Sequence, residues 1–249
     1  MKPGVFDYVL VGLIVVREIV EWRRWPHIVR AVRAGVTGAR TKMYRDTFVF
    51  LWIATLYVLA LWIMQGRSWS ALWLGSVIPW RLAIGVSAAA IAVVFFVLQG
   101  RKVQKALARP KAVAALRKQL EFANCLAPET GSERRGFWLL SLTAGICEEI
   151  LFRGFLMWLI AAWTNLLVAV ILSSLLFGCV HIYLGAAYVP KAAIVGLIFA
   201  FVVVASGSLW PAIVIHAAMD LSSGEIAFRV AQASLGNTSE PVAAAPAMS

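Results

Sequence analysis

The sequence is poor in charged residues and in cysteine. Charged residues make up 14% of its 249 residues, against about 25% in an average soluble domain. Apolar residues make up 61%, where a soluble domain has about 45–50%. This balance excludes a water-soluble globule and a disordered chain. The three cysteines form no CxxC pair, which excludes a disulfide-stapled scaffold and leaves a polytopic membrane protein.

Long apolar runs recur along the chain. Because about 20 apolar residues cross a bilayer, they predict an all-α transmembrane bundle of about 7–8 membrane helices. The run at 5–20 is short and carries Asp7, Arg17 and Glu18, so it is expected either to span the membrane or to lie at its interface. The runs cover residues 5–20, 47–64, 82–98, 137–161, 164–184, 190–206 and 209–223.

These runs divide the chain into three parts. Residues 1–136 are expected to form N-terminal membrane helices with two basic loops, and residues 137–223 a helical core. Residues 224–249 are expected to form a partly disordered tail, because 236–249 is rich in Ala, Pro and Ser. The tryptophan-rich stretch 69–80 is expected at the membrane interface, which Trp prefers.

The positive charge is concentrated in two segments. The net charge is +11, and residues 21–46 hold seven Lys or Arg while residues 99–136 hold nine. The positive-inside rule therefore places both segments in the cytoplasm, and we expect them to contact anionic lipid rather than nucleic acid. The short loops and the Ala/Pro tail favour the bacterial inner membrane.

A few charged and polar side chains lie inside apolar runs, where each costs several kcal/mol and is therefore a candidate functional group. Glu149 and Arg153 are four residues apart, which puts them on one helix face as a pair. Glu148 precedes Glu149 and is about 100° away from it around the helix axis, so we expect it to point elsewhere and to lack the Arg153 partner. Burial without a counter-charge raises the pKa of a carboxylate toward the range of a general base. The remaining candidates are His181 and the pair His216 and Asp220. Together these groups could bind and activate water.

The three motifs also carry a resemblance. Glu148-Glu149-x-x-x-Arg153, Phe177-x-x-x-His181 and His216-x-x-x-Asp220 occur in order, each in an apolar run. This pattern resembles the CPBP family of CAAX proteases and bacteriocin-processing proteins, over about residues 137–223.

The resemblance implies a glutamate-dependent intramembrane protease with no metal or other cofactor. In that family's terms Glu148 activates the water with help from His181, while His216 and Asp220 stabilise the oxyanion. Glu149 and Arg153 would keep in place the helix that carries the first motif. The CAAX endopeptidases typically have Asn at the last position. Because an ionised Asp cannot donate a hydrogen bond, Asp220 is expected either to be protonated or to orient His216.

Other interpretations stay open at this point. The Glu149–Arg153 pair could be purely structural, and Cys147 and Cys179 are expected to be packing residues. His181, His216 and a carboxylate could bind zinc, although the sequence has no HExxH. A non-catalytic immunity or scaffold protein and a proton-coupled transporter are further alternatives. The expected partner of the enzyme is a membrane-anchored protein or peptide substrate.

Overall fold

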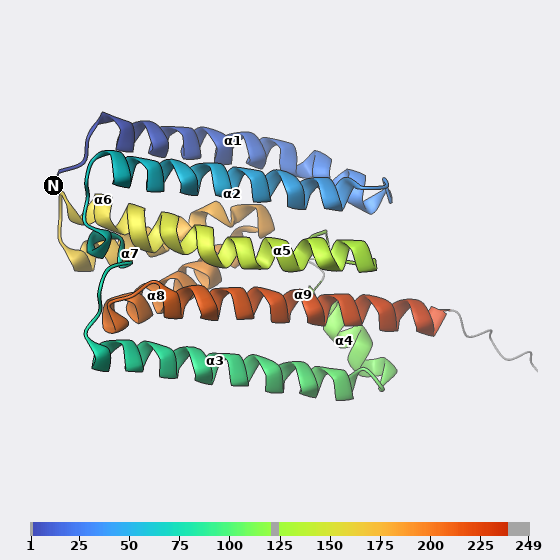
Figure 1. Ribbon diagram of the computed structural model, residues 1–249. Helices are drawn as coiled ribbons and strands as arrows, with labels where there is room; N and C mark the ends of the chain where they lie inside the picture. Colours follow the sequence, from blue (N-terminus) through green and yellow to red (C-terminus); the bar gives the residue numbers. More distant parts are fainter. Residues whose placement is uncertain (1, 121–124, 239–249) are drawn as a thin grey trace, which may run out of the picture.

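The apolar runs fold into long helices that lie side by side (Figure 1). A computed structural model describes residues 2–120 and 125–238, and within those ranges all regular secondary structure is helical, which confirms the predicted all-α bundle. In chain order the elements are α1 (Val5–Arg33), α2 (Ala39–Met64), η1 (Trp69–Leu72), α3 (Pro79–Ala106), α4 (Pro110–Leu120), α5 (Gly131–Glu148), η3 (Glu149–Leu156), α6 (Met157–Ala161), α7 (Leu166–Val180), η4 (Ile182–Leu184), η5 (Ala186–Tyr188), α8 (Val189–Ser206) and α9 (Trp210–Thr238).

Several helices extend past their apolar runs, which corrects the predicted loops. Of the predicted loop 21–46 only residues 34–38 separate α1 from α2, and the predicted loop 99–136 contains the end of α3 and all of α4. The reason is that Lys, Arg and Glu are good helix formers, so a helix continues after its hydrophobic stretch ends. Within the predicted tail 224–249, α9 continues as far as Thr238. Residues 239–249 lie outside the described ranges.

The chain is an integral membrane protein. By length and composition, α2, α3 and the stretch Ala186–Ser206 are long and apolar enough to cross a bilayer. The turn between α1 and α2 and the junction of α3 and α4 lie at one end of the bundle, away from the N-terminus (Figure 1). Both basic segments are therefore on the same side; that this side is cytoplasmic stays a prediction.

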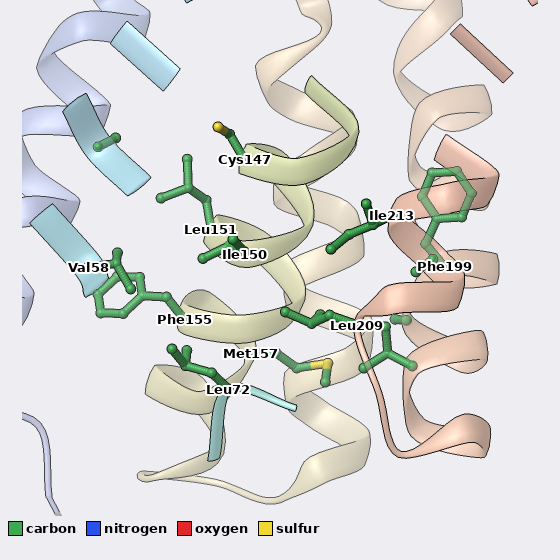
Figure 2. Close-up of a cluster of buried hydrophobic side chains, with 14 of the residues drawn as sticks. Val58, Leu72, Cys147, Ile150, Leu151, Phe155, Met157, Phe199, Leu209 and Ile213 are labelled. Carbon is green, nitrogen blue, oxygen red and sulfur yellow. The ribbon is translucent and has the colours of Figure 1, made fainter. Parts of the chain in front are cut away.

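Helix α9 is the central element of the bundle. It packs against α3 and α5, and α5 in turn packs against α2. Apolar side chains of η3 such as Leu151 and Phe155 are directed toward Val58 of α2, while Phe199 and Ile213 close the other side of the core (Figure 2). Cys147 is fully buried in this cluster, as expected for a packing residue.

Residues 131–161 form one continuous helical rod with an irregular centre. Its middle section, η3, is π-helical, a local widening of the helix that is frequent at functional sites. Gly145, one turn before this section, lets α5 approach α9 closely. A Cβ atom at this position would lie 2.8 Å from Cβ of Ala217 and 2.9 Å from its backbone nitrogen. The close approach brings the two glutamates of α5 and η3 to the level of His216.

Helices α7 and α8 form a hairpin that is shorter than its neighbours. With 15 residues α7 is about 22 Å long, whereas the 29 residues of α9 span about 43 Å. The irregular residues 181–188 that join α7 to α8 therefore lie well inside the bundle rather than at its end (Figure 1). Non-helical backbone at such a depth occurs in membrane proteins where it is covered by protein or lines a hydrated cavity.

The N-terminal helix is tied to the bundle by a buried ion pair. Asp7 accepts two hydrogen bonds from the guanidinium of Arg67, at 2.8 and 2.6 Å, and one from the backbone nitrogen of Gly4. The Arg67 guanidinium lies next to the rings of Trp62 and Trp158, 4.8 and 4.4 Å from their centroids, and the two rings contact each other edge-on. This cluster holds the start of α1 at the end of the bundle opposite the basic segments.

Candidate active site

The polar residues predicted from the motifs come from separate elements that meet next to the π-helical section. Glu148 is the last residue of α5, Glu149 and Arg153 lie on η3, and His216 and Asp220 lie on α9. His181 follows the last residue of α7. The structure brings five of these six side chains into one connected cluster around the His216 imidazole, and His181 lies beside it.

Glu149 is the hub of the buried part of the cluster. Its Oε1 accepts hydrogen bonds from Nη1 of Arg153 at 2.9 Å and from Nδ1 of His216 at 2.8 Å. The Glu149–Arg153 pair predicted from the spacing is thus confirmed as a contact. Since a carboxylate accepts and Nδ1 donates, Glu149 also fixes the orientation of the His216 ring.

The other nitrogen of His216 faces two further carboxylates. Nε2 lies 3.9 Å from Oε2 of Glu148 and 3.6 Å from Oδ2 of Asp220. These distances are too long for direct hydrogen bonds, so Nε2 stays accessible to a third polar group. Glu148 makes no ion pair with Arg153, as its position on the helix predicts, but it faces the imidazole that Glu149 binds, on the side of the other nitrogen.

Exposure separates the cluster into two parts. The side chains of Glu149 and Arg153 are 0% exposed, whereas those of Glu148 and Asp220 are 17% and 30% exposed. The buried part can position other groups but cannot meet a substrate, while the partly exposed part can.

His181 ends α7 and has one defined hydrogen bond. Its Nδ1 lies 2.7 Å from the backbone oxygen of Phe177, which can only accept, so Nδ1 carries the proton. In the neutral ring Nε2 is then an acceptor. His181 also interacts electrostatically with His216 and Asp220.

Aromatic rings enclose Arg153 and link the histidines. The guanidinium lies 4.2 Å from the centroid of Phe177 and 5.4 Å from that of Phe199. Phe177 also contacts His181 and His216, at centroid distances of 4.7 and 6.0 Å, and Phe199 stacks on His216 at 5.0 Å. These rings exclude water from the guanidinium, which strengthens its attraction to Glu149.

Reasoning from the sequence missed some of these contacts. Nothing in the motifs indicates that Glu149 binds His216, because that contact depends on how closely α5 and α9 approach. The contribution of α1 was also missed: Trp25 packs edge-on against Tyr183 at 4.8 Å, and Tyr183 stacks on His181 at 6.0 Å. Glu18 of α1 interacts electrostatically with Glu148. The charged pair Arg17-Glu18 in an apolar run was the available signal.

Among residues 2–120 and 125–238, no group of three or more His, Cys, Asp or Glu side chains has a geometry that could hold a metal ion. The six site residues include two imidazoles, both in contact with Phe177, and two partly exposed carboxylates that face His216. These are the groups that acid–base hydrolysis uses.

Comparison with known proteins agrees with this chemistry. Residues 133–222 match the family model described as type II CAAX prenyl endopeptidase Rce1-like. No curated protein and no solved structure gives a significant match. The matched segment runs from the first turn of α5 into α9 and contains all six site residues. Residues 133–222 are therefore similar to the Rce1-like CAAX endopeptidases, in agreement with the protease family that the three motifs predicted.

Proposed function

We propose that the protein is an intramembrane endopeptidase in which Glu148 and His181 activate a water molecule without a metal ion. The observation that carries the proposal is the position of His216. Glu149 holds its Nδ1 from the buried side, and Glu148 and Asp220 face its Nε2 from the partly exposed side. A fixed imidazole beside two accessible carboxylates is a set of groups suited to peptide hydrolysis.

The first step is the attack of water on the scissile carbonyl carbon. Glu148 takes one proton from the water as its oxygen forms the new C–O bond, and Nε2 of His181 accepts a hydrogen bond that orients the same water. The carbonyl π bond breaks, and its electron pair becomes an oxyanion. General-base assistance of this kind contributes about 10² to 10⁴-fold.

His216 is suited to stabilise that oxyanion. A protonated imidazole donates from both nitrogens, so Nδ1 can bind Glu149 while Nε2 binds the oxyanion. Asp220, next to Nε2, supports the protonated ring if it is ionised, or donates a second hydrogen bond if it is neutral. When the tetrahedral intermediate collapses, the oxyanion pair re-forms the C=O bond, the C–N bond breaks and the amine leaves with the proton held by Glu148. The other product is a carboxylic acid, which becomes a carboxylate when it releases the second proton of the water to solvent.

The substrate approaches from the end of the bundle that carries the basic segments, which we assign to the cytoplasm of a bacterial inner membrane. The irregular hairpin at residues 181–188 faces that end, and α7 and α8 fill the bundle beyond it. This placement suits a peptide bond close to a membrane anchor, such as the C-terminal segment of a membrane-attached protein.

The test uses the purified protein in liposomes and a quenched fluorogenic peptide with a C-terminal CAAX sequence, with and without a farnesyl group. We expect cleavage by the parent and a loss of about 10² to 10⁴-fold in Glu148→Gln and His181→Ala. His27→Ala is the matched control, because His27 is exposed on α1 and far along the chain from the motifs. Unchanged cleavage in both site variants contradicts the proposal.

A chelator and metal analysis separate this mechanism from a zinc hydrolase. The metal-independent mechanism predicts full activity after treatment with EDTA and less than stoichiometric zinc in the active protein. Loss of activity with EDTA and its recovery with added zinc would support the zinc alternative. The two forms of the peptide show whether the enzyme requires a prenyl group.

A further inference from the structure

A large apolar groove lies on the opposite side of α9 from the candidate active site. Its volume is about 720 Å³, within the range of about 300–1,000 Å³ typical of small-molecule sites. Helices α3 and α5 form its walls and α9 its floor; α9 lies between the two in Figure 1. The apolar lining includes Val93 and Val97 of α3, Trp138 and Leu142 of α5, and Ala218 and Leu221 of α9.

The groove does not belong to the active site. The α9 residues that line it include Ala218, Ser222, Glu225 and Arg229, which follow one another at intervals of three or four and so share a helix face. His216, two residues before Ala218, lies about 200° away around the same helix. The groove and the catalytic cluster therefore use opposite faces of α9.

The length of the groove matches one leaflet of a bilayer. Along α9 it extends from Ala218 to Arg229, about 16 Å at a rise of about 1.5 Å per residue. Half of the roughly 30 Å hydrocarbon core is about 15 Å. An apolar groove of this length on a membrane-spanning surface fits a single acyl chain that begins at one interface and ends near the midplane.

One end of the groove carries an excess of positive charge. Arg134 and Arg229 both bind Glu225: Nε and Nη2 of Arg134 each donate at 2.8 Å, and Nε of Arg229 donates at 2.7 Å. Arg101 of α3 lines the same end and is exposed, with no ion-pair partner in the described part of the chain. This end of the groove thus carries three guanidinium groups and one carboxylate, a net charge of +2.

The Arg134 side chain is held rigidly in this cluster. Besides its paired hydrogen bonds to Glu225, the guanidinium lies 4.6 Å from the centroid of Trp138 and 4.9 Å from that of Phe228. A preorganised guanidinium loses little freedom when it meets an anion, and planar guanidinium groups match phosphate geometry. The net charge of +2 at this end of the groove is therefore suited to bind a phosphate group.

We propose that this groove is a binding site for an anionic phospholipid from the leaflet at the basic end of the bundle. One acyl chain lies along α9 between α3 and α5, and the phosphate contacts Arg101 with the Arg134–Glu225–Arg229 cluster beneath it. The basic segments attract anionic lipid in general, whereas this groove would bind the acyl chain of one lipid molecule at a defined place. It is independent of the proposed peptidase mechanism.

The test measures lipid bound to the delipidated protein in detergent by native mass spectrometry. Dioleoyl phosphatidylglycerol is compared with phosphatidylcholine that has the same acyl chains. We expect one tightly bound phosphatidylglycerol and at least tenfold weaker binding of phosphatidylcholine. Equal binding of the two lipids would show non-selective bulk lipid only and overturn the proposal.

Two pairs of variants locate the site. Val97→Trp fills the groove and is expected to weaken phosphatidylglycerol binding at least tenfold, whereas Ile91→Trp, on the same helix but outside the lining, should not. Arg101→Gln is expected to reduce the preference for phosphatidylglycerol, and Arg117→Gln, an exposed basic residue on α4, should leave it unchanged.

Both residues replaced by Trp are exposed, at 49% for Val97 and 71% for Ile91, so neither variant should prevent folding. Leu142→Trp fills the groove from the α5 wall and provides a second probe if Val97→Trp does not fold. If a folded groove-filling variant binds phosphatidylglycerol as tightly as Ile91→Trp, the proposal is wrong.

Discussion

Two buried carboxylate–arginine pairs occur in this bundle, and they differ in how completely they are satisfied. Asp7 and Arg67 join α1 to the loop after α2, with both carboxylate oxygens hydrogen-bonded. Of this pair, Nε of Arg67 is buried without a hydrogen-bond partner among the described residues. Glu149 and Arg153 lie in the catalytic cluster and share one direct hydrogen bond, at 2.9 Å. Oε2 of Glu149 and both Nε and Nη2 of Arg153 are buried and have no hydrogen-bond partner among the described residues.

The difference shows what each pair contributes. A buried pair is stabilising when its geometry is good and most of its polar atoms are satisfied. The Asp7–Arg67 pair leaves one nitrogen without a partner, against three atoms in the Glu149–Arg153 pair, which suits Asp7–Arg67 to anchoring a helix. The Glu149 oxygen that binds Arg153 also binds His216, so this pair uses its geometry to orient the imidazole. We therefore expect the outer pair to govern stability and the inner pair to govern activity.

The largest expected effect comes from replacing the inner pair by apolar residues of similar size. Glu149→Leu with Arg153→Met removes both buried charges, so stability should stay close to that of the parent. Cleavage of the fluorogenic peptide should fall by about 10² to 10⁴-fold, because His216 loses the acceptor that orients it. Thermal unfolding in detergent and peptide cleavage measure the two effects.

The matched control is Asp7→Leu with Arg67→Met at the outer pair. It makes the same chemical change far from His216 and should leave cleavage within a few-fold of the parent. Equal losses of activity in the two double variants would mean that both pairs act only through the fold, and the comparison would fail.

Breaking the outer pair from one side is the next largest effect. Arg67→Ala leaves Asp7, which is 0% exposed, without its counter-charge and removes a cation that contacts two tryptophan rings. Breaking a buried pair in this way costs about 3–5 kcal/mol of unfolding free energy. Unfolding measured in detergent should show this loss, while the rate of cleavage per folded molecule stays unchanged. A variant with normal stability and low activity would reverse the proposed roles.

A smaller effect is expected at Asp220, on the open side of the His216 ring. Asp220→Asn keeps the shape and can donate a hydrogen bond to an oxyanion, so cleavage should stay within about tenfold of the parent, about 1.4 kcal/mol. Asp220→Ala offers no polar group and should lose more. If Asn is as inactive as Ala, the negative charge of Asp220 is what His216 requires.

The sequence predicts the inner pair better than its surroundings. Residues at i and i+4 on one helix must be neighbours, so the Glu149–Arg153 contact follows from local geometry alone. The contacts of His216 depend on which face of α9 meets α5, and this is decided by the absence of a side chain at Gly145 against Ala217. Such a close approach between distant residues leaves no periodic pattern in the sequence.

The outer pair shows the same limit more strongly. Asp7 was recognised as a charge in an apolar run, but its partner lies 60 residues away in a segment without any motif. The hydrophobic runs also predicted the number and order of the long helices more reliably than the residues at which these helices end. Arg and Lys are good helix formers, so a helix can continue beyond its apolar run. The basic ends of α1 and α3 illustrate this.

A third carboxylate–arginine pair extends the comparison to the edge of the bundle. Both oxygens of Glu133 lie 3.0 Å from Nη1 of Arg40, and Glu133 also accepts from the backbone nitrogens of Glu129 and Thr130 at the start of α5. Its side chain is 14% exposed. This pair is nearer to water than the other two, and its charge can be titrated without disturbing the apolar core.

The smallest expected effect is the removal of that charge. Burial alone raises the pKa of Glu133, but the backbone N–H groups and the Arg40 guanidinium outweigh it and hold the pKa below its ordinary value of 4.5. A lowered pKa stabilises the fold above the unfolded-state value, and that stability is lost as the pH falls through the folded-state value. Glu133→Gln should therefore cost about 1 kcal/mol at pH 7, and this cost should disappear as the pH falls through the lowered pKa of Glu133. The matched control is Glu129→Gln. The Glu129 carboxylate is 55% exposed and also pairs with Arg40, so its replacement should cost less at pH 7.

The free energy of unfolding of both variants and the parent, measured from pH 7 to acidic pH, gives the difference. If Glu133→Gln stays less stable than the parent at low pH, the shape of Glu133 and not its charge stabilises this edge of the bundle.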